Sequence, residues 1–366
     1  MCNACIPMPT ETNSVDAFAE RLMSILNEGA LSLMISIGHR TGLFDAMAEL
    51  PPATVGEIAG HCGLEPRYVR EWLAALVTGK VLHYEPRQQR YHLPKAHAAL
   101  LTRAAAPDNI AVFTQYIGVL AQVEDRIIDC FRSGGGVGYE HYPRFHEVMA
   151  EDSGQTVLAA LDEHILPLIG EVIPQLERGI SVLDIGCGRG RVLIHLARAF
   201  PHSRFVGYEL SPEAVADAVR QVREAGLNNL RFEQRDLTGF AESAPDSAFD
   251  LVTAFDAVHD QKTPQSVLDG VFKCLKPGGT FLMQDIRASS RLEKNLDHPL
   301  APLLYTISTM HCMSVSLAQG GAGLGTMWGE ELATEMLHRA GFREVSVHRL
   351  AHDFQNNFYV MQRQHG

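Results

Sequence analysis

One short stretch of sequence, between Ser181 and Phe200, constrains the fold of this 366-residue chain more than any other. Ser181–Ile185 reads SVLDI, an apolar run typical of a buried strand, and it leads directly into the glycine-rich turn Gly186–Gly190. The amphipathic segment Arg191–Phe200 follows at once. Glycines at alternate positions allow a tight turn and leave room for a ligand against the backbone. The stretch therefore predicts a strand, a ligand-binding turn and a helix.

Two carboxylates follow the next two apolar strands. Arg204–Tyr208 is followed by Glu209, whose carboxylate can accept hydrogen bonds from both hydroxyls of a ribose. Leu230–Gln234 is followed by Asp236, which can bind the exocyclic amine of an adenine. The same layout suits NAD, but Arg191 stands where the phosphate-binding pattern Gly-x-Gly-x-x-Gly/Ala requires a small residue. The pattern therefore favours S-adenosylmethionine, with an NAD-dependent dehydrogenase as the alternative.

Five motifs in order resemble those of class I S-adenosylmethionine-dependent methyltransferases. They are VLDIGCGRG, GYELS, RDL at 235–237, DLVTAFDAVHD at 250–260 and LKPGG at 275–279. The resemblance implies an α/β, Rossmann-like domain whose seven-stranded sheet ends in an antiparallel hairpin formed by 345–349 and 357–361. It also implies S-adenosyl-L-methionine as the cofactor. The residues expected to hold it are Asp184, Gly186, Gly188, Gly190, Glu209, Leu210, Asp236, Leu237, Phe255 and Asp256.

A histidine at the end of the fourth predicted strand is the expected catalytic residue. The run Ala257-Val258-His259-Asp260 resembles the histidine-aspartate pair of small-molecule O-methyltransferases, in which the histidine is the general base. A base helps when the acceptor is a hydroxyl or a thiol, and histidine titrates near neutral pH. The chain departs from that family at Gln261, where a tryptophan is usual, and no acidic partner residues are evident. We therefore expect transfer to an oxygen, with an S-methyltransferase acting on a thiol or thioether as the alternative. A thioether needs no base, and a role of His259 in shaping the pocket also stays open.

The whole chain more closely resembles a group of bacterial two-domain methyltransferases. The shared stretches are 142–149, which follows the glycine-rich break 133–138, and 303–329. Both are expected to cover the carboxyl edge of the sheet, where α/β proteins bind ligands. They supply the candidate substrate contacts His141, Tyr142, Phe145, His146, Tyr305, Met310 and His311. No metal is expected, because Met and Cys at the spacing of 310–313 are more often core residues.

The first hundred residues predict a mainly helical winged-helix domain. Helical spacing covers 16–48, 54–59 and 66–77, and two short apolar runs, 81–84 and 91–93, flank a turn. A winged helix can bind DNA, but this chain carries a net charge of −12, and Glu65 and Glu71 offset Arg67 and Arg70 on the candidate recognition helix. We therefore expect a dimerisation domain and no nucleic-acid partner, with a transcriptional regulator that binds S-adenosylmethionine as the alternative.

Three segments are expected: a helical winged-helix domain at 1–110, a helical linker and substrate lid at 111–178, and the methyltransferase domain at 179–366. The apolar helices 16–27 and 30–38 predict a homodimer, because so small a domain cannot easily bury both. The seven cysteines are odd in number and scattered, so reduced thiols are expected, the Cys2/Cys5 pair included. No stretch is apolar enough to span a membrane, which predicts a cytoplasmic protein. The expected partner is a small molecule.

Overall fold

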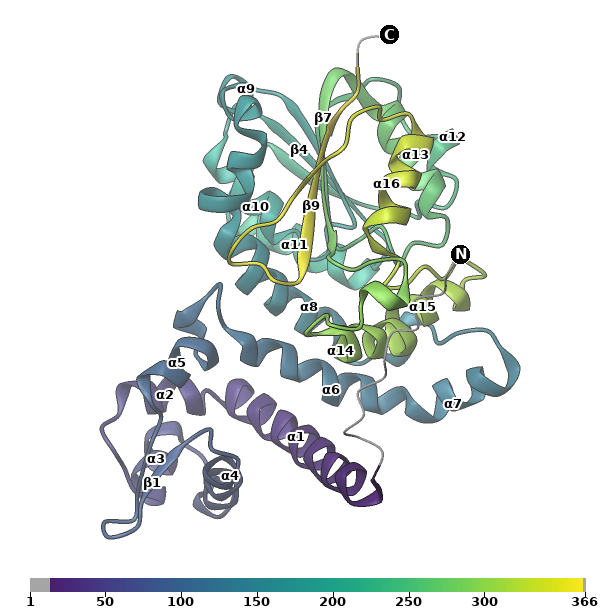
Figure 1. Ribbon diagram of the computed structural model, residues 1–366. Coiled ribbons are helices and arrows are strands. Elements are labelled where there is room, and N and C mark those ends of the chain that lie inside the picture. The colour runs from purple at the N-terminus through teal and green to yellow at the C-terminus, as the bar shows by residue number, and fades with distance from the viewer. Residues whose placement is uncertain (1–13, 365–366) are drawn as a thin grey trace. The chain divides into compact units, whose positions relative to one another are not determined.

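The computed structural model describes residues 14–364, and its contacts divide the chain into two units (Figure 1). The first unit runs to Ala105 and takes in Asn109–Gly118; the second holds Ala106–Asp108 and Val119 onward. The Cys2/Cys5 pair lies outside the described residues. Among the described residues, no helix is long and apolar enough to cross a membrane.

The first unit consists of helices and a two-stranded antiparallel wing. Its elements, with short 3-10 or π turns labelled η, are α1 (Val15–Thr41), α2 (Leu43–Glu49), α3 (Val55–Cys62), α4 (Pro66–Thr78), β1 (His83–Glu85), β2 (Arg90–His92), α5 (Lys95–Leu101), η1 (Arg103–Ala105) and η2 (Ile110–Thr114). Gly42 ends α1 in the left-handed conformation, with a φ of 73°. Thr54 and Glu57 start α3 with a capping box. Phe44 and Trp72 pack in the core, with ring centroids 5.4 Å apart.

The second unit is built on a seven-stranded sheet with the order β5-β4-β3-β6-β7-β9-β8. Its strands are β3 (Ser181–Ile185), β4 (Arg204–Glu209), β5 (Leu230–Gln234), β6 (Phe249–Phe255), β7 (Leu275–Ile286), β8 (Ser346–His348) and β9 (Asn356–Gln362). The first five pair in parallel, whereas β9 runs antiparallel to both β7 and β8. The seven-stranded sheet with a final antiparallel pair is therefore confirmed.

Helices cover both faces of the sheet (Figure 1). They are α9 (Ile173–Arg178), α10 (Arg191–Ala199), α11 (Pro212–Glu224), α12 (Phe240–Ser243), α13 (Pro264–Cys274) and α16 (Gly329–Ala340). Alternate side chains of β3 enter different cores: Val182 packs in the core that includes α9 and α10, and Leu183 in the core that includes α13 and α16. Burial on both faces explains why β3 reads as a continuous apolar run.

Two further segments of the second unit connect to the sheet. The first, before β3, holds α6 (Gln115–Leu120), in which the unit boundary falls, then η3 (Ala121–Val123), α7 (Glu124–Ser133), η4 (Tyr139–His141), α8 (Phe145–Ser153), η5 (Gly154–Leu158), η6 (Leu161–Ile165) and η7 (Leu166–Val172). The second, after β7, holds η8 (Leu292–Lys294), α14 (Ala301–Ile307), η9 (Ser308–Cys312) and α15 (Met313–Ala318). Regular helix is broken over 154–172, where Pro167 opens η7 and Ile169 leaves helical geometry.

Candidate active site

The glycine turn after β3 adopts a backbone that side chains disfavour. Gly186, Gly188 and Gly190 all have positive φ, at 66°, 53° and 70°. A Cβ on Gly188 would meet nothing within 4 Å, so this glycine faces open space. A Cβ on Gly190 would stand 2.1 Å from the Phe232 ring, and one on Gly186 would stand 2.5 Å from the Ala257 side chain. Gly188 thus borders a ligand space, whereas Gly190 is required for packing.

Both carboxylate oxygens of Glu209, at the end of β4, accept hydrogen bonds from backbone amides. Its Oε2 accepts a hydrogen bond from the Gly188 amide at 2.9 Å, and its Oε1 accepts one from the Ser211 amide at 2.8 Å. A pyrophosphate would need the amides of such a turn as its own donors. Because the Gly188 amide already binds a carboxylate, the turn suits a ligand that brings hydroxyl donors, as a ribose does.

A cavity of about 770 Å³, here called the cofactor cavity, opens over the carboxyl ends of β3, β4 and β6. Eight of the ten predicted cofactor residues line it: Gly186, Gly188, Glu209, Leu210, Asp236, Leu237, Phe255 and Asp256. The Asp256 Oδ2 accepts from the Gln284 amide at 2.7 Å, and its buried Oδ1 has no partner among the described residues. Carboxylates at three strand ends suit the amine and hydroxyl donors of S-adenosylmethionine, whose sulfonium is cationic.

Asp184 and Gly190, the two remaining predicted cofactor residues, do not line the cavity. Asp184 is fully buried within β3 and accepts a hydrogen bond from the Thr253 hydroxyl at 2.7 Å. Burial raises the pKa of its carboxyl to about 7, against the lowering effect of that hydrogen bond. The burial follows from its place in a central strand that is covered on both faces.

His259 forms a buried pair with a carboxylate at the end of β7. Its Nδ1 donates to the Asp285 Oδ1 at 2.8 Å, and the same oxygen accepts from the Trp328 indole at 2.9 Å and the Ile286 amide at 2.8 Å. Burial lowers the pKa of His259, but the Asp285 charge, Cys312 and the hydrogen bonds outweigh it and hold that pKa well above its ordinary value. The Nδ1 contact leaves Nε2 as the proton-accepting nitrogen.

Sequence reasoning missed Asp285 as the acidic partner of His259. The signal was present, because Asp285 stands at the carboxyl end of a long apolar strand, where α/β proteins place functional side chains. Its pairing with His259 depends on β6 and β7 being adjacent and parallel. His259 itself is only 3% exposed and does not line the cofactor cavity, although its neighbours Ala257 and Asp260 do.

Tyr139 and Asp260 form a second polar pair that the sequence did not predict. The Tyr139 hydroxyl donates to the Asp260 Oδ2 at 2.7 Å, and both residues line the cofactor cavity. Burial raises the pKa of both groups, well above the ordinary value for Tyr139. The Tyr139 ring also stacks on His146, with centroids 5.7 Å apart. No spacing in the sequence links Tyr139 with Asp260, because the two lie 121 positions apart.

The seven predicted substrate residues fall into three groups. Tyr142, Phe145 and His146 line the cofactor cavity, and His141 lines a second cavity beside it. Tyr305, Met310 and His311 line neither.

The residues outside both cavities have structural contacts instead. The Tyr305 hydroxyl accepts from the Asn295 amide at 3.2 Å, and the Met310 carbonyl accepts from the Tyr142 hydroxyl at 2.5 Å. His311 stacks on Phe145, with centroids 3.4 Å apart, and burial lowers its pKa well below the ordinary value. Across residues 14–364, no group of three or more potential ligand residues could hold a metal ion.

Two protein families match the chain. The Rv2258c-like winged HTH domain matches residues 29–103, and a methyltransferase domain matches residues 176–341. Together with the fold, these matches define a two-domain chain in which a winged helix precedes a methyltransferase domain. That predicted combination is confirmed.

Individual relatives are similar to parts or to the whole of the chain. An uncharacterised methyltransferase of Synechocystis is 35% identical over 132 residues, which is 35% of this chain and 55% of that protein. The chain spans about half the length of the curated relatives it matches. A putative O-methyltransferase of Nostoc punctiforme superposes with a TM-score of 0.67 at 16% identity, covering 94% of this chain and 98% of that one. Human N-acetylserotonin methyltransferase, solved with S-adenosylmethionine, gives 0.65 at 19% identity, covering 98% and 100%.

Proposed function

We propose that the protein is an S-adenosylmethionine-dependent methyltransferase that acts on a hydroxyl oxygen of a small molecule. One observation carries the proposal: Glu209, Asp236 and the open side of Gly188 border a single cavity. Glu209 would hold the ribose and Asp236 the adenine, while the bound cofactor supplies a methyl group already activated by its sulfonium. The oxygen acceptor is supported by the similarity to an O-methyltransferase fold and, for a small molecule, to an enzyme named for N-acetylserotonin.

His259 is proposed as the general base. Asp285 orients the ring through Nδ1, and Nε2 would accept the proton of the acceptor hydroxyl once a bound acceptor reaches this ring, which is buried beside the cavity-lining Ala257 and Asp260. The remaining task of the chain is to align acceptor and methyl group and to exclude water. The aromatic side chains of Tyr142, Phe145 and His146 along the cavity suit that task.

Calorimetric titration of the cofactor is the first test of this proposal. S-adenosylmethionine is expected to bind with a dissociation constant in the micromolar range, about −8 kcal/mol. Glu209→Ala should weaken binding at least about tenfold, because it removes the carboxylate that accepts the ribose hydroxyls. Glu224→Ala, at an exposed residue of α11 outside the cavity lining, is the matched control. Tighter binding of NAD, or full affinity in Glu209→Ala, would contradict the cofactor assignment.

Replacement of His259 tests the base. His259→Ala should lower turnover by about 10²–10⁴ and leave cofactor affinity nearly unchanged, because the ring acts on the acceptor. A thioether acceptor needs no base and predicts a turnover that survives the substitution. Specific DNA binding by the first unit would instead support the regulator that uses S-adenosylmethionine only as a ligand.

A further inference from the structure

A second cavity, of about 680 Å³ and here called the outer cavity, adjoins the cofactor cavity. Four residues line both cavities: Tyr139, Glu140, Leu210 and Gln319. The cofactor cavity has a volume typical of one ligand-sized site. Because the two cavities share a wall, an acceptor that meets S-adenosylmethionine in the cofactor cavity can extend into the outer cavity.

The walls of the outer cavity are fixed by tight backbone packing. The chain between α7 and η4, residues 134–138, forms one side, and α15 forms another. The Val137 amide donates to the Ser314 hydroxyl at 2.8 Å. A Cβ on Gly136 would stand 1.9 Å from the Ser314 carbonyl oxygen, so the two segments are in direct contact. The outer cavity is thus a built part of the second unit.

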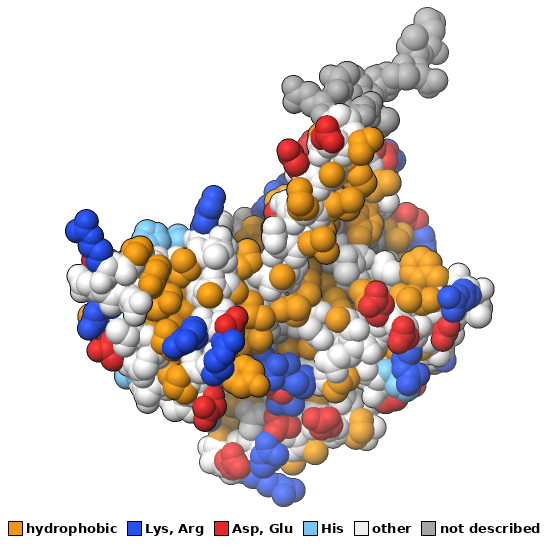
Figure 2. All heavy atoms as spheres, turned by 90° about the horizontal axis from the view of Figure 1, so that it is seen from below, with side chains coloured by type: hydrophobic (Ala, Val, Ile, Leu, Met, Phe, Trp, Pro, Cys, Tyr) orange, Lys and Arg blue, Asp and Glu red, His pale blue; other side chains and the backbone are white. Residues whose placement is uncertain are grey.

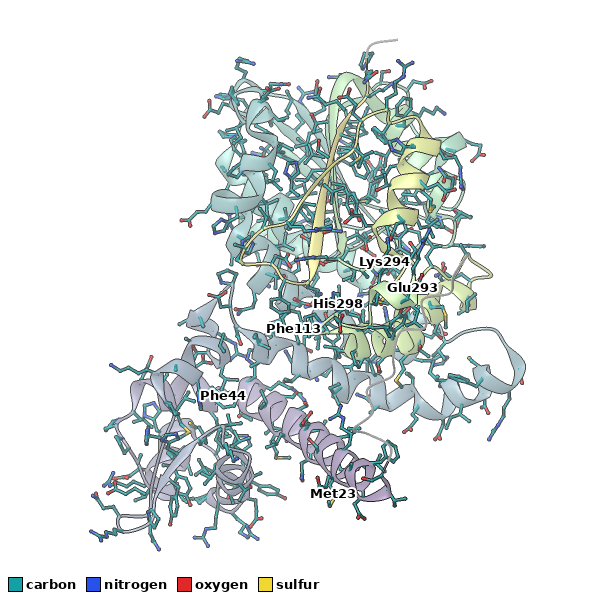
Figure 3. All side chains as sticks on the ribbon, in the orientation of Figure 1. Met23, Phe44, Phe113, Glu293, Lys294 and His298 are labelled. Atoms are coloured by element: carbon teal, nitrogen blue, oxygen red, sulfur yellow. The ribbon has the colours of Figure 1, made fainter. Side chains whose placement is uncertain are left out.

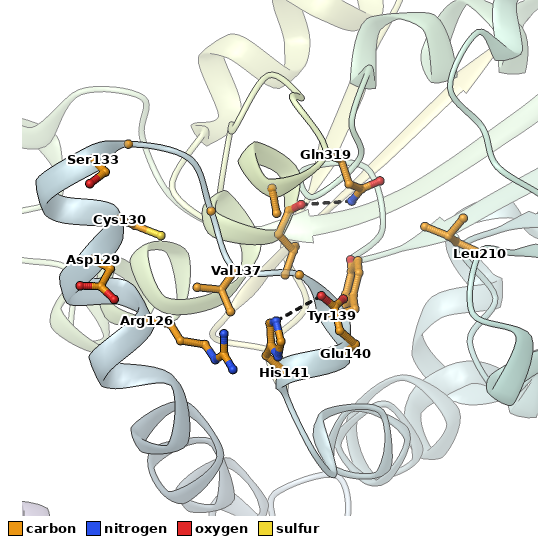
Figure 4. Close-up of a pocket in the computed structure, with 15 residues that line it drawn as sticks. Arg126, Asp129, Cys130, Ser133, Val137, Tyr139, Glu140, His141, Leu210 and Gln319 are labelled. Atoms are coloured by element: carbon orange, nitrogen blue, oxygen red, sulfur yellow. Dashed lines mark hydrogen bonds and ion pairs between the residues drawn. The ribbon is translucent and has the colours of Figure 1, made fainter.

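The charges around the outer cavity leave one cation without a counter-ion. Asp129 pairs with Arg132 at 3.3 Å, and Glu140 pairs with His141 at 3.3 Å. Arg126 lines the cavity, and within residues 14–364 it has no ion-pair partner. Figure 4 shows its guanidinium reaching from α7 toward His141. A guanidinium without a counter-ion is a suitable site for a carboxylate or a phosphate group.

We propose that the outer cavity binds the far end of the methyl acceptor, and that this end carries an anionic group held by Arg126. The inference rests on the proposed methyl transfer, since it places the reacting end of the same molecule in the cofactor cavity. Tyr139 would then contact the middle of the acceptor, because it belongs to both walls. The acceptor is accordingly an extended hydroxylated molecule with a carboxylate or phosphate at its distal end.

The test compares charged and neutral probes on protein saturated with S-adenosylhomocysteine. The probes are para-hydroxycinnamate, its neutral amide para-hydroxycinnamamide, and para-hydroxyphenylpropyl phosphate. The carboxylate or the phosphate should bind about tenfold more tightly than the amide. Arg126→Gln should remove this preference and Arg126→Lys should retain part of it. Arg178→Gln, at an exposed arginine of α9 outside the lining of both cavities, should leave it unchanged.

The experiment distinguishes a failure of the proposed function from a failure of the outer-cavity inference. Saturation with S-adenosylhomocysteine is measured first, and its failure would contradict the proposed function. If S-adenosylhomocysteine binds but the anionic probes show no preference over the amide, or do not bind, the outer-cavity inference alone is overturned. A preference that survives in Arg126→Gln also overturns it. Stronger binding of the carboxylate or of the phosphate identifies which anion the site takes. Circular dichroism and S-adenosylhomocysteine affinity verify that the variants are folded.

Discussion

At the scale of single residues, the site depends on carboxylates whose surroundings differ. Glu209 accepts two backbone amides at the cavity wall, whereas Asp285 is fully buried and gathers three donors on one oxygen. The second oxygen of Asp285 has no partner among the described residues. The first carboxylate can therefore still meet a ligand from the cavity, and the second acts through His259.

Asp285 should control the pH at which His259 can act as a base. Its negative charge raises the pKa of His259, so wild-type turnover should rise with pH above the ordinary histidine range, about 6.5. Asp285→Asn removes that charge and should move the inflection to lower pH, because the neutral imidazole then forms earlier. It should also lower the maximal rate about tenfold or more. The measurement is turnover against pH with saturating substrates.

The control for this experiment is Asp246→Asn, an exposed residue outside both cavities. It should keep the wild-type profile. An unchanged inflection in Asp285→Asn would mean that another group sets the pH dependence; Asp260 is then the candidate, since it lines the cofactor cavity.

At the scale of elements, the site is a set of strand ends combined with two inserted segments. β3, β4 and β6 present the predicted cofactor residues at one edge because parallel strands end together. The segment that contains η4 and α8 supplies the aromatic wall, and α15 anchors the chain before η4. We therefore expect the close contact between residues 134–138 and α15 to maintain the part of the site that would bind the acceptor.

Gly136→Ala tests that contact. The added Cβ would overlap the Ser314 carbonyl oxygen at 1.9 Å and the Ala318 amide nitrogen at 2.5 Å, so the two segments must separate. We expect a loss of about 1–3 kcal/mol in unfolding free energy and weaker acceptor binding, with cofactor affinity retained. Thermal unfolding and calorimetry measure both.

Gly170→Ala serves as the matched control, because a Cβ there meets nothing within 4 Å and its φ is not positive. It should change the free energy of unfolding by no more than surface substitutions usually do, about ±0.5 kcal/mol. If the two variants are equally stable, residues 134–138 are not packed tightly against α15.

At the scale of the whole molecule, the first unit carries an apolar surface without a described partner. Large apolar side chains of α1 are exposed: Val15, Phe18, Leu22, Met23, Ile25, Leu26, Leu33 and Ile37. Figure 2 shows apolar side chains gathered where α1 begins, and Figure 3 shows Met23 on that helix, while Phe44 lies among the helices of the unit. We propose that a second copy of the chain covers this surface, as expected from the apolar helices.

Light scattering tests this proposal. The wild-type protein should be a dimer at tens of micromolar, since a stable interface buries about 1,200–2,000 Å² and α1 offers a long apolar face. The double substitution Phe18→Glu and Leu26→Glu should give a monomer, because it places charges within that face. Tyr68→Glu, at an exposed aromatic residue of α4, should stay dimeric. A monomeric wild-type protein would contradict the proposal.

The sequence by itself determined the α/β sheet, the winged helix and most of the cofactor wall. Those features arise from local patterns: Ser181–Ile185 is β3 to the residue, Glu209 is the last residue of β4, and Asp236 stands two positions after β5. Period-two burial and glycine turns are visible without any knowledge of distant contacts.

Only the tertiary structure decided which distant side chains meet. It paired His259 with Asp285, joined Tyr139 to Asp260 across the fold, and directed Tyr305 to Asn295 instead of a cavity. It also placed Arg126 in the lining of the outer cavity. Such pairings depend on strand order and on how inserted segments cover the sheet edge. Those features are set by packing across long sequence separations, which a local pattern does not encode.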